Sequence, residues 1–247
     1  MLKVRVMPTM LYKDYGLVKG KGFDSWRRTG SLMQTVKVYN MREVDELVFV
    51  DIAATEEGRE PDYALVDDFA DDCFMPLTVG GGVRTLDQVG KLLAVGADKV
   101  AVNTAAVERP EIVGEIAKKY GAQCCVVSID FRGKEVVTRS GRKKTGLDVV
   151  SHAKKVAALG AGEILLTSVE RDGEFTGYDL EMTRAVAEAV KIPVIASGGC
   201  GKYEDMAEVL SKGKASAVAA ASIFHFTEQT PLEAKQYLKT KGFAVRA

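Results

Sequence analysis

The sequence of 247 residues lacks several features that would assign it to particular classes of protein. It has no excess charge, because 34 Lys and Arg residues balance 34 Asp and Glu residues. No molecule-wide field therefore attracts the chain to nucleic acid or to an anionic membrane, and any anion site must be local. No apolar run approaches the roughly 18 residues of a membrane span, and the apolar N-terminus lacks a signal-peptide cleavage pattern. We expect a soluble, cytoplasmic protein with no nucleic-acid or membrane partner.

Cysteine and histidine are also scarce. The four cysteines have no C-x-x-C spacing, and a disulfide framework would be unusual in a chain long enough to form a large core. We interpret the cysteines as reduced and mostly buried. His152 and His225 have no partners at metal-ligand spacing. We therefore predict no metal and no cofactor.

The sequence does contain a regular alternation of two patterns. Eight short runs rich in Val, Ile and Leu are each followed by a Gly- or Asp-bearing turn and then by a helical pattern. This alternation is typical of parallel strands joined by crossover helices. The predicted strands cover residues 4–10, 46–51, 76–79, 99–102, 124–129, 163–167, 193–197 and 217–221.

An internal repeat favours a closed barrel over an open sheet. Gly80-Gly81 and Gly198-Gly199 each follow a strand that begins with proline, and an offset of 118 residues carries the first pair onto the second. The same offset carries Asn103-Thr104 onto Ala221-Ser222. Two half-barrels of four β/α units explain the offset most simply. We predict an α/β fold, a single (β/α)8 TIM barrel domain over residues 1–247.

The loops at the carboxyl ends of the strands build the functional site in barrels of this kind. Glycines just before a helix let backbone N–H groups converge on a phosphate, although glycines also serve merely to permit tight turns. The duplication and the neighbouring hydroxyl groups favour two phosphate cradles, and therefore a small-molecule ligand with a phosphate at each end. The first cradle is Gly81, Gly82, Asn103 and Thr104, and the second is Asp172, Gly173, Gly198, Gly199, Ala221 and Ser222.

Charged residues begin four of the predicted strands, at the opposite end of the barrel. Charges that face a barrel interior are costly to bury unless they are paired. We therefore predict a ring of ion pairs across this floor, which would ordinarily stabilise the barrel. The ring consists of Arg5, Glu46, Lys99 and Glu163.

Three long segments resemble one known family. They are VGGGVRTLDQVGKLLAVGADKVAVNTAAV, GAGEILLTSVERDGEFTGYD and IPVIASGGCGK with AAASIFHF. They are similar to the cyclase subunit of imidazole glycerol phosphate synthase, over nearly the whole chain. The resemblance implies an ammonia-dependent lyase of histidine biosynthesis that binds a phosphorylated substrate and pairs with a separate glutaminase subunit.

The resemblance also assigns roles to the floor of the barrel. It implies that the four paired charges form a gate through which ammonia enters, and that Asp98 lies at the glutaminase interface. The chain has no nucleophile-elbow cysteine with a histidine partner, so it has no means of releasing ammonia from glutamine itself. We expect a heterodimer with the glutaminase.

The family's chemistry implies two carboxylates, at the ends of strands 1 and 5, and only one is present. Asp130, in VVSIDFRG, matches the strand-5 carboxylate, although a hydrogen-bonded strand-end cap is the alternative. Leu11 stands at the strand-1 position, and the internal repeat independently aligns Leu11 with Asp130. Asp14 follows, beyond the strand end. Lys19 matches a lysine that assists substrate closure, although a solvated lysine is the ordinary alternative. We expect Trp26, Arg27 and Arg28 to lie in the long loop after strand 1, where the resemblance implies a substrate-covering segment and a solvated loop is the alternative.

Three functions follow from these residues. Leucine transfers no proton, and losing a positioned acid or base costs about a hundred- to ten-thousandfold in rate. We therefore favour a paralogue, since KDYGLVK, EVDELVFVDI and CFMP resemble proteins associated with amidation of surface-polysaccharide (lipopolysaccharide) sugars. There the barrel would conduct ammonia to a third protein, a sugar amidotransferase. The alternatives are the histidine-pathway cyclase and an ammonia-independent phosphosugar isomerase.

Overall fold

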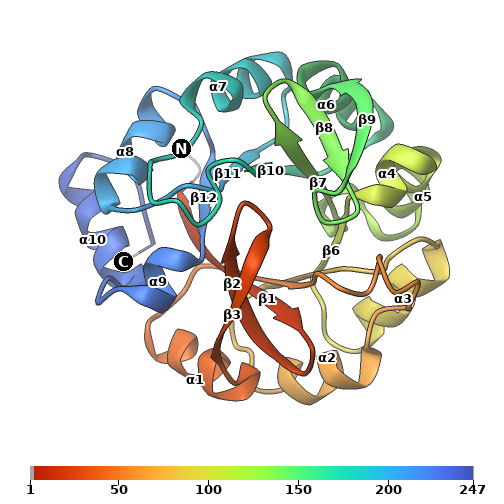
Figure 1. Cartoon of the computed structure of the whole chain (residues 1–247), viewed down its shortest axis with the longest axis horizontal. Helices are drawn as coiled ribbons and strands as arrows, with labels where there is room; N and C mark the ends of the chain where they lie inside the picture. The colour runs from red at the N-terminus through yellow and green to blue at the C-terminus, as the bar shows by residue number, and fades with distance from the viewer. Residues whose placement is uncertain (1–2, 247) are drawn as a thin grey trace.

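The computed structural model describes residues 3–246 and contains a closed barrel of eight parallel strands, surrounded by helices (Figure 1). The barrel strands are β1 (Arg5–Lys13), β4 (Leu47–Asp51), β5 (Leu77–Gly80), β6 (Lys99–Val102), β7 (Cys125–Arg132), β10 (Glu163–Ser168), β11 (Val194–Ser197) and β12 (Ala217–Ala220). They pair in the order β10-β11-β12-β1-β4-β5-β6-β7, and β7 pairs with β10 to close the ring. The predicted barrel is confirmed, and each predicted strand is present with its ends shifted by at most three residues.

The helices cover the outside of the barrel. Side-chain caps explain where several of them begin: Thr85 and Thr230 form capping boxes, and Asp148 accepts a hydrogen bond from the Ser151 N–H. The helices are α1 (Leu32–Met41), α2 (Tyr63–Ala70), α3 (Leu86–Ala94), α4 (Thr104–Glu108), α5 (Glu111–Tyr120), α6 (Val149–Leu159), α7 (Leu180–Ala189), α8 (Tyr203–Ser211), α9 (Ser222–Phe226) and α10 (Pro231–Thr240), with a 3-10 turn η1 (Ala122–Cys124).

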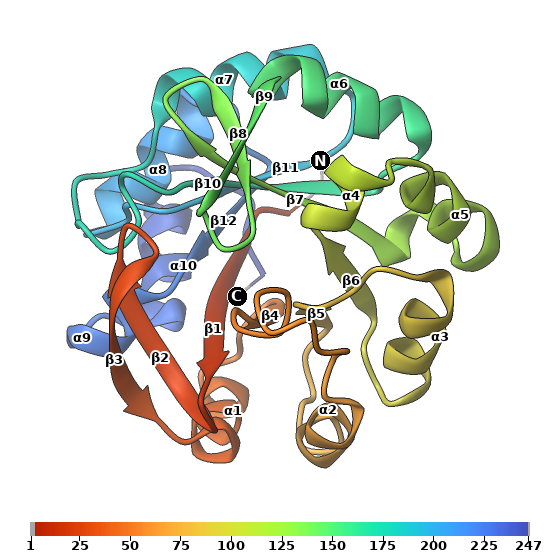
Figure 2. The ribbon, with the colours of Figure 1, turned by 45° about the vertical axis from the view of Figure 1, so that its right-hand side comes forward.

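Two hairpins depart from the predicted alternation of strand and helix. They add β2 (Gly16–Lys21) and β3 (Asp24–Gly30) after β1, and β8 (Glu135–Thr138) and β9 (Lys143–Asp148) after β7. Figures 1 and 2 show both hairpins on the same face of the barrel. The expectation of a loop at residues 26–28 is wrong, because these residues lie on β3. The mostly exposed side chains of β3 give no alternating pattern, and only the edge of β2 makes the segment a strand.

The half-barrel repeat is visible in the order of elements, with one change to its register. Gly80 is the last residue of β5, as Ser197 is of β11, and the glycine pairs with positive φ angles are Gly81-Gly82 and Gly198-Gly199. These pairs are 117 residues apart, so the alignment of Gly80-Gly81 with Gly198-Gly199 is wrong by one residue. The sequence alone does not show which two of Gly80, Gly81 and Gly82 correspond to Gly198-Gly199, because the three glycines are consecutive.

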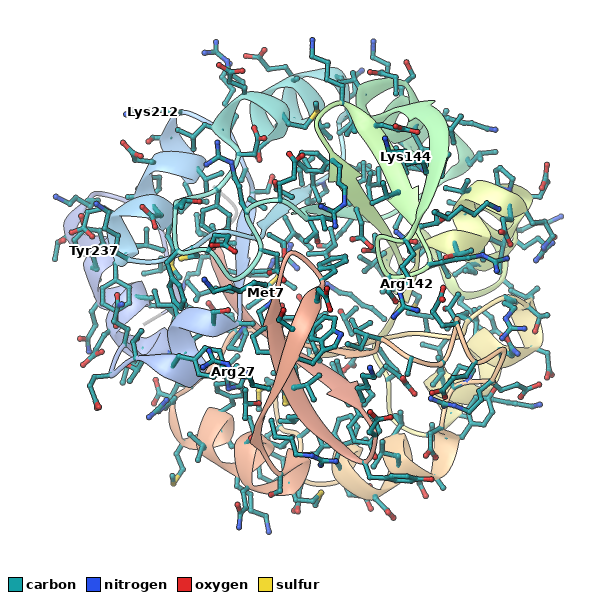
Figure 3. The ribbon with its side chains drawn as sticks, viewed as in Figure 1. Met7, Arg27, Arg142, Lys144, Lys212 and Tyr237 are labelled. Carbon is teal, nitrogen blue, oxygen red and sulfur yellow. The ribbon has the colours of Figure 1, made fainter. Side chains whose placement is uncertain are left out.

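The core has an inner and an outer part. Most buried apolar side chains lie between the strands and the helices. A smaller cluster fills the barrel interior, and Figure 3 shows one member, Met7, near the barrel axis, far from Lys212 and Tyr237 at the rim. The interior cluster consists of Met7, Val48, Ala101, Val126, Leu165, Ile195, Ala217 and Ala219.

A buried ion pair ties the last helix to the first strands. The Lys235 side chain on α10 is 1% exposed and donates to the Glu43 carbonyl, with its Nζ 3.4 Å from Asp45 Oδ1. Asp45 in turn accepts a hydrogen bond from the Val6 N–H on β1. The contact holds the C-terminal helix against the floor of the barrel. Within residues 3–246, no helix is long and apolar enough to cross a membrane.

Candidate functional site

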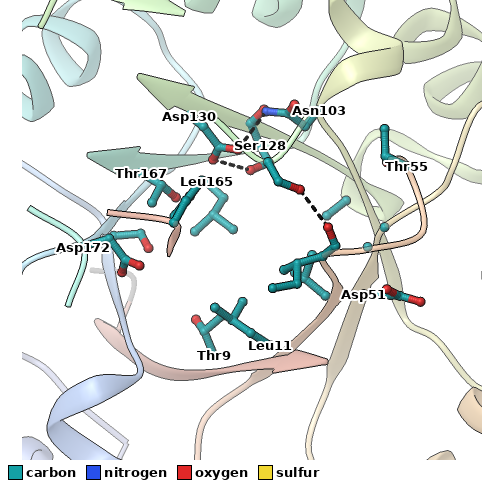
Figure 4. A pocket seen from close by; sticks show the side chains of 18 of the residues that line it. Thr9, Leu11, Asp51, Thr55, Asn103, Ser128, Asp130, Leu165, Thr167 and Asp172 are labelled. Carbon is teal, nitrogen blue, oxygen red and sulfur yellow. Dashed lines mark hydrogen bonds between the residues drawn. The ribbon is translucent and has the colours of Figure 1, made fainter. Parts of the chain in front are cut away.

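A cavity of about 590 Å³ occupies the barrel mouth, at the carboxyl ends of the strands. Every residue of the two predicted cradles lines it, as do Leu11, Lys19 and Asp130. Figure 4 labels Leu11, Asn103, Asp130 and Asp172 among them. Barrel topology explains the convergence, because the ends of eight parallel strands meet around one mouth. The structure thus brings together residues from all parts of the sequence.

Two cradle glycines are required by the close approach of a neighbouring strand. Gly81 has a φ of +105°, and a Cβ there would lie 2.2 Å from the Asp51 carbonyl oxygen. Gly198 has a φ of +87°, and a Cβ there would lie 2.5 Å from the Ser168 carbonyl oxygen. A side chain at either position would clash with backbone, so the local conformation depends on glycine. Each half of the barrel thus has a glycine with positive φ that packs against the backbone of a neighbouring strand.

The hydroxyl groups of the two cradles differ in their surroundings. Thr104 Oγ1 accepts a hydrogen bond from the Arg139 N–H at 3.2 Å, so the tip of the β8–β9 hairpin touches the first cradle. The Ser222 Oγ is buried and has no hydrogen-bond partner among the described residues. A buried hydroxyl without a partner is costly unless a ligand satisfies it. Of the two hydroxyl groups, that of Ser222 is therefore the one whose hydrogen-bonding capacity the described residues leave unused.

Asp130 lies near the end of β7 in a polar pocket of the mouth. Its carboxylate accepts hydrogen bonds from Asn103 Nδ2 at 3.2 Å and from Ser128 Oγ at 3.3 Å. Burial, with the negative charge of Asp172 nearby, raises the pKa of Asp130 to about 7. A carboxyl group that titrates near neutrality is suited to both accepting and donating a proton.

Leu11 occupies the wall of the mouth opposite Asp130 (Figure 4). It lies on β1, in register with Val50 of β4, and it is half-buried. Asp14 lies at the turn between β1 and β2, where it lines a separate shallow hollow rather than the cavity. The fold as described therefore does not bring Asp14 to the position opposite Asp130.

Lys19 is placed in the cavity wall but in a strand rather than in the expected loop. It lies on β2 and is 2% exposed, and its Nζ forms an ion pair with the carboxylate of Asp172. The Gly22 N–H at the tip of the same hairpin donates to the Asp172 carbonyl at 2.8 Å. Both contacts bind the hairpin to the second cradle.

The tips of the two hairpins meet over the cavity. A Cβ at Gly141 would lie 3.0 Å from the Phe23 ring, so the tips are in contact. The β8–β9 tip is held by Ser140 Oγ, which donates to the Ile52 carbonyl at 2.7 Å, and by an ion pair of Arg142 with Glu56. The hairpins thus form a roof that covers part of the mouth.

The predicted ring of ion pairs is present at the opposite end of the barrel. Arg5 lies 2.6 Å from Glu46 and 2.7 Å from Glu163, and Lys99 lies 2.9 Å from Glu46 and 3.0 Å from Glu163. Thr78 Oγ1 also donates to Glu46 at 2.9 Å. Each carboxylate contacts both cations, so the four charges compensate one another.

Comparison with known protein families matches residues 5–230 to the family described as histidine biosynthesis protein. The match covers most of the chain. The chain belongs to this histidine biosynthesis family. The closed ring of eight parallel strands agrees with a barrel of the histidine biosynthesis type.

Several cavity residues of this histidine biosynthesis barrel were missed by sequence reasoning. Asp51 ends β4, and its carboxylate accepts hydrogen bonds from the N–H groups of Ala53 and Ala54 at 3.0 Å each. The expectation that strand-end residues build the site would have found it. Other cavity residues that reasoning from the sequence missed are Thr9, Phe23, Ser128, Thr167 and Ser197.

The two histidines lie outside the cavity wall. His152 is buried on α6, and His225 lies on α9, where burial lowers its pKa to about 4. Among residues 3–246 no three His, Cys, Asp or Glu side chains are grouped to hold a metal ion. The four cysteines are free thiols, of which Cys125 and Cys200 are buried and the other two half-buried.

Proposed function

We propose that the chain is an ammonia-receiving synthase subunit that binds a phosphorylated substrate at its mouth. In this proposal a separate glutaminase docks on the floor and releases ammonia into the barrel. The observation that carries the proposal is the succession of three layers along one axis: the ring of ion pairs, the apolar interior cluster and the polar cavity. A purely structural plug does not require a polar cavity above it.

The chemistry of the layers suits neutral ammonia. An apolar layer disfavours ammonium ions, because burying an unpaired charge is costly, whereas ammonia is small and uncharged. The layer includes the small side chains of Ala101, Ala217 and Ala219, which leave the least obstruction. Above it, Thr9, Ser128 and Thr167 present hydrogen-bonding groups to the cavity. Ammonia would thus pass from a paired-charge entrance to polar acceptors.

The floor also offers an apolar surface beside the ring. Phe74 precedes β5 and is 84% exposed, and Met41 at the end of α1 is 77% exposed. They lie near one another, because Asn40 donates to the Asp72 carbonyl and accepts from the Phe74 N–H. Aromatic residues and methionine are enriched at protein interfaces. Together with Asp98, which is exposed beside Lys99, they support docking of the glutaminase on this face.

Leu11 supports the finer part of the proposal. A cyclisation that needs an acid and a base on opposite walls has one carboxylate, Asp130, facing a leucine. The barrel would instead supply ammonia for amidation of a surface-polysaccharide sugar, with a third protein as the amidotransferase. This assignment retains the ammonia gate and the phosphate cradles, and it explains the missing carboxylate.

One observation favours a second candidate, the histidine-pathway cyclase. The pKa of Asp130 is raised to about 7, a value suited to general acid and base catalysis. A single carboxyl group that cycles between its two forms, with water in place of the second group, would then perform both proton transfers.

An assay with ammonium salt and the histidine-pathway ribonucleotide substrate separates the two candidates. We expect no turnover by the wild type and measurable turnover by Leu11→Asp, in which a carboxylate faces Asp130 again. Leu11→Asn is the matched control, since it is polar but does not ionise. Wild-type turnover would instead identify the chain as the cyclase, and turnover by the asparagine variant would show that polarity alone suffices.

Docking of the glutaminase is tested by co-purification with glutaminase subunits of the same organism. We expect Phe74→Ser to weaken the complex at least tenfold, because it removes the most exposed aromatic group of the floor. Tyr15→Ser is the control, since Tyr15 is 93% exposed at the hairpin turn on the opposite face. Equal loss in both variants, or no complex with the wild type, would contradict the docking face.

A further inference from the structure

The cavity lining includes two groups of side chains of unlike chemistry, an apolar wall and a polar wall. The apolar wall is made of half-buried side chains of β1, β4 and the β2–β3 hairpin, and the polar side chains of Thr9, Lys19 and Asp51 from the same elements line the cavity beside it. The polar wall is made of hydrogen-bonding side chains at the ends of β6, β7, β10 and β11, and Figure 4 shows Leu11 of the first group opposite Asp130 of the second. The apolar wall consists of Leu11, Phe23, Trp26, Val50 and Ile52, and the polar wall of Asn103, Ser128, Asp130, Thr167 and Ser197.

Trp26 is the largest side chain of the apolar wall and is held in place by its hairpin. A Cβ at Gly20 would lie 3.0 Å from the Trp26 ring, so the absence of a side chain at Gly20 lets the indole pack against β2. The next residue, Arg27, which Figure 3 labels, has its guanidinium over the Phe226 ring of α9. The guanidinium carbon lies 4.6 Å from the centre of that ring. That contact fixes β3 on the side away from the cavity.

Strand β2 and the tip of the hairpin are also anchored. Lys19 pairs with Asp172, and the Arg132 guanidinium donates to the Gly22 carbonyl at 3.0 Å. The indole is therefore positioned before any ligand binds. A preorganised aromatic surface contributes more to affinity than one that must be ordered on binding.

We propose that this apolar wall is a stacking platform for a polyhydroxylated ring, and that Trp26 is its main contact. The inference rests on the proposed function, because it concerns the part of the phosphorylated ligand that lies between the two cradles. A sugar ring presents carbon-bound hydrogens on one face and hydroxyl groups around its edge. The first fits an aromatic and aliphatic wall, and the second fits facing hydroxyl, amide and carboxylate groups.

The polar wall favours a sugar over a flat nucleobase. It is rich in groups that both donate and accept, since Ser128, Thr167 and Ser197 each carry a hydroxyl. Such groups are suited to the hydroxyl groups of a sugar, which also both donate and accept hydrogen bonds. Leu11 is central to the arrangement, because a carboxylate at that position would break the apolar wall. Its presence thus replaces a proton-transfer group with part of a binding surface.

The sole tryptophan of the chain makes the proposal directly measurable. Emission from Trp26 is recorded while the protein is titrated with fructose 1,6-bisphosphate, a sugar ring with a phosphate at each end. Hexanediol 1,6-bisphosphate, which has no ring, and adenosine 3′,5′-bisphosphate, which has a base, are the comparison probes. We expect a saturable change in emission with the sugar, and calorimetric affinity about tenfold higher than for the acyclic probe.

Variants assign that difference to the indole. We expect Trp26→Leu to bind fructose 1,6-bisphosphate about tenfold more weakly and to bind the acyclic probe as the wild type does, whereas Trp26→Phe retains most of the affinity. Tyr15→Leu, in the turn between β1 and β2 and outside the cavity, is the matched control. Circular dichroism verifies that each variant is folded.

The outcomes separate this inference from the proposed function. If Trp26→Leu and the wild type bind fructose 1,6-bisphosphate with equal affinity, the stacking platform is wrong and the cradles are unaffected. The same conclusion follows if the wild type prefers the adenosine probe and loses that preference in Trp26→Leu. If no bisphosphate binds the wild type, both the platform and the phosphate-binding mouth are wrong. Loss of the ammonia role alone, seen in the glutaminase experiment, would leave the tryptophan titration unchanged.

Discussion

Replacing Asp130 by asparagine tests whether the barrel mouth holds this carboxyl group in its neutral form. Burial raises the pKa of Asp130 from an ordinary 3.8 to about 7, and the charge of Asp172 adds to the effect. Asparagine has nearly the same shape, keeps an oxygen for the Ser128 hydroxyl and does not titrate. The variant therefore removes the proton equilibrium while disturbing the packing little.

The sign follows from the protons bound in each state. Between about pH 4 and pH 7 the unfolded chain has lost the Asp130 proton, whereas the folded chain retains it. The stabilising contribution is complete below the unfolded pKa and disappears as the pH rises through the folded pKa. Each pKa unit corresponds to about 1.4 kcal/mol, so the wild type loses on the order of 4 kcal/mol across this range.

Urea unfolding of both proteins at several pH values between 5 and 8 measures this loss. We expect the variant to gain stability relative to the wild type by about 1.4 kcal/mol per pH unit from pH 5 to pH 7, and the difference to level off above. Asp148→Asn is the matched control. Asp148 is an exposed helix cap, and the hydrogen bond from the Ser151 N–H lowers its pKa, so its difference from wild type should be constant over this range.

A difference that stays flat for Asp130→Asn, or that grows in favour of the wild type, would refute the reasoning. It would mean that Asp130 is ionised throughout, and that its neighbours stabilise its charge more than burial opposes it. Carbon NMR of the Asp130 carboxyl group reports the same titration independently of unfolding.

Three further substitutions test one phosphate cradle and two sets of ion pairs. Gly199→Val should abolish binding of bisphosphates measured by calorimetry, because a Cβ there would lie 2.2 Å from the Gly177 carbonyl oxygen; retained binding would exclude a cradle at this position. Glu46→Gln should lower the free energy of unfolding by about 3 kcal/mol, because Arg5 and Lys99 each lose one of their two carboxylate partners. An unchanged free energy of unfolding in urea titrations would show that the ion pairs of the ring contribute little to stability. Lys235→Met should cost about 3 kcal/mol by the same assay because its carboxylate partner remains buried, and unchanged stability would mean that this partner is protonated or hydrated.

The sequence predicted the barrel well because its signals are local and repeated. Parallel strands buried on both faces produce continuous apolar runs, and the turns after them produce glycines at regular places. The two hairpins escaped prediction for the opposite reason. The side chains of β3 are largely exposed, and its strand conformation depends on pairing with β2. The sequence DSWRRTG does not by itself indicate that this segment pairs with β2.

The sequence also located much of the candidate site. Both cradles, Asp130 and the charged floor followed from strand ends and from resemblance, and the structure places them around one cavity and in one ring. Asp51 was overlooked at a strand end. Trp26 was expected in a loop after strand 1, whereas it lies on a strand of the hairpin that folds over the mouth.

The eight barrel strands, the glycine turns after them and the identity of the charges were determined by the amino-acid sequence alone, since each depends on residues close together in the chain. Tertiary structure decided which side chains face one another: Lys19 with Asp172, Phe23 with Gly141, and Leu11 with Asp130. These pairs are separated by more than a hundred residues, and only closure of the barrel brings them together. The chemistry of the mouth is therefore a property of the closed barrel, although every group in it is encoded locally.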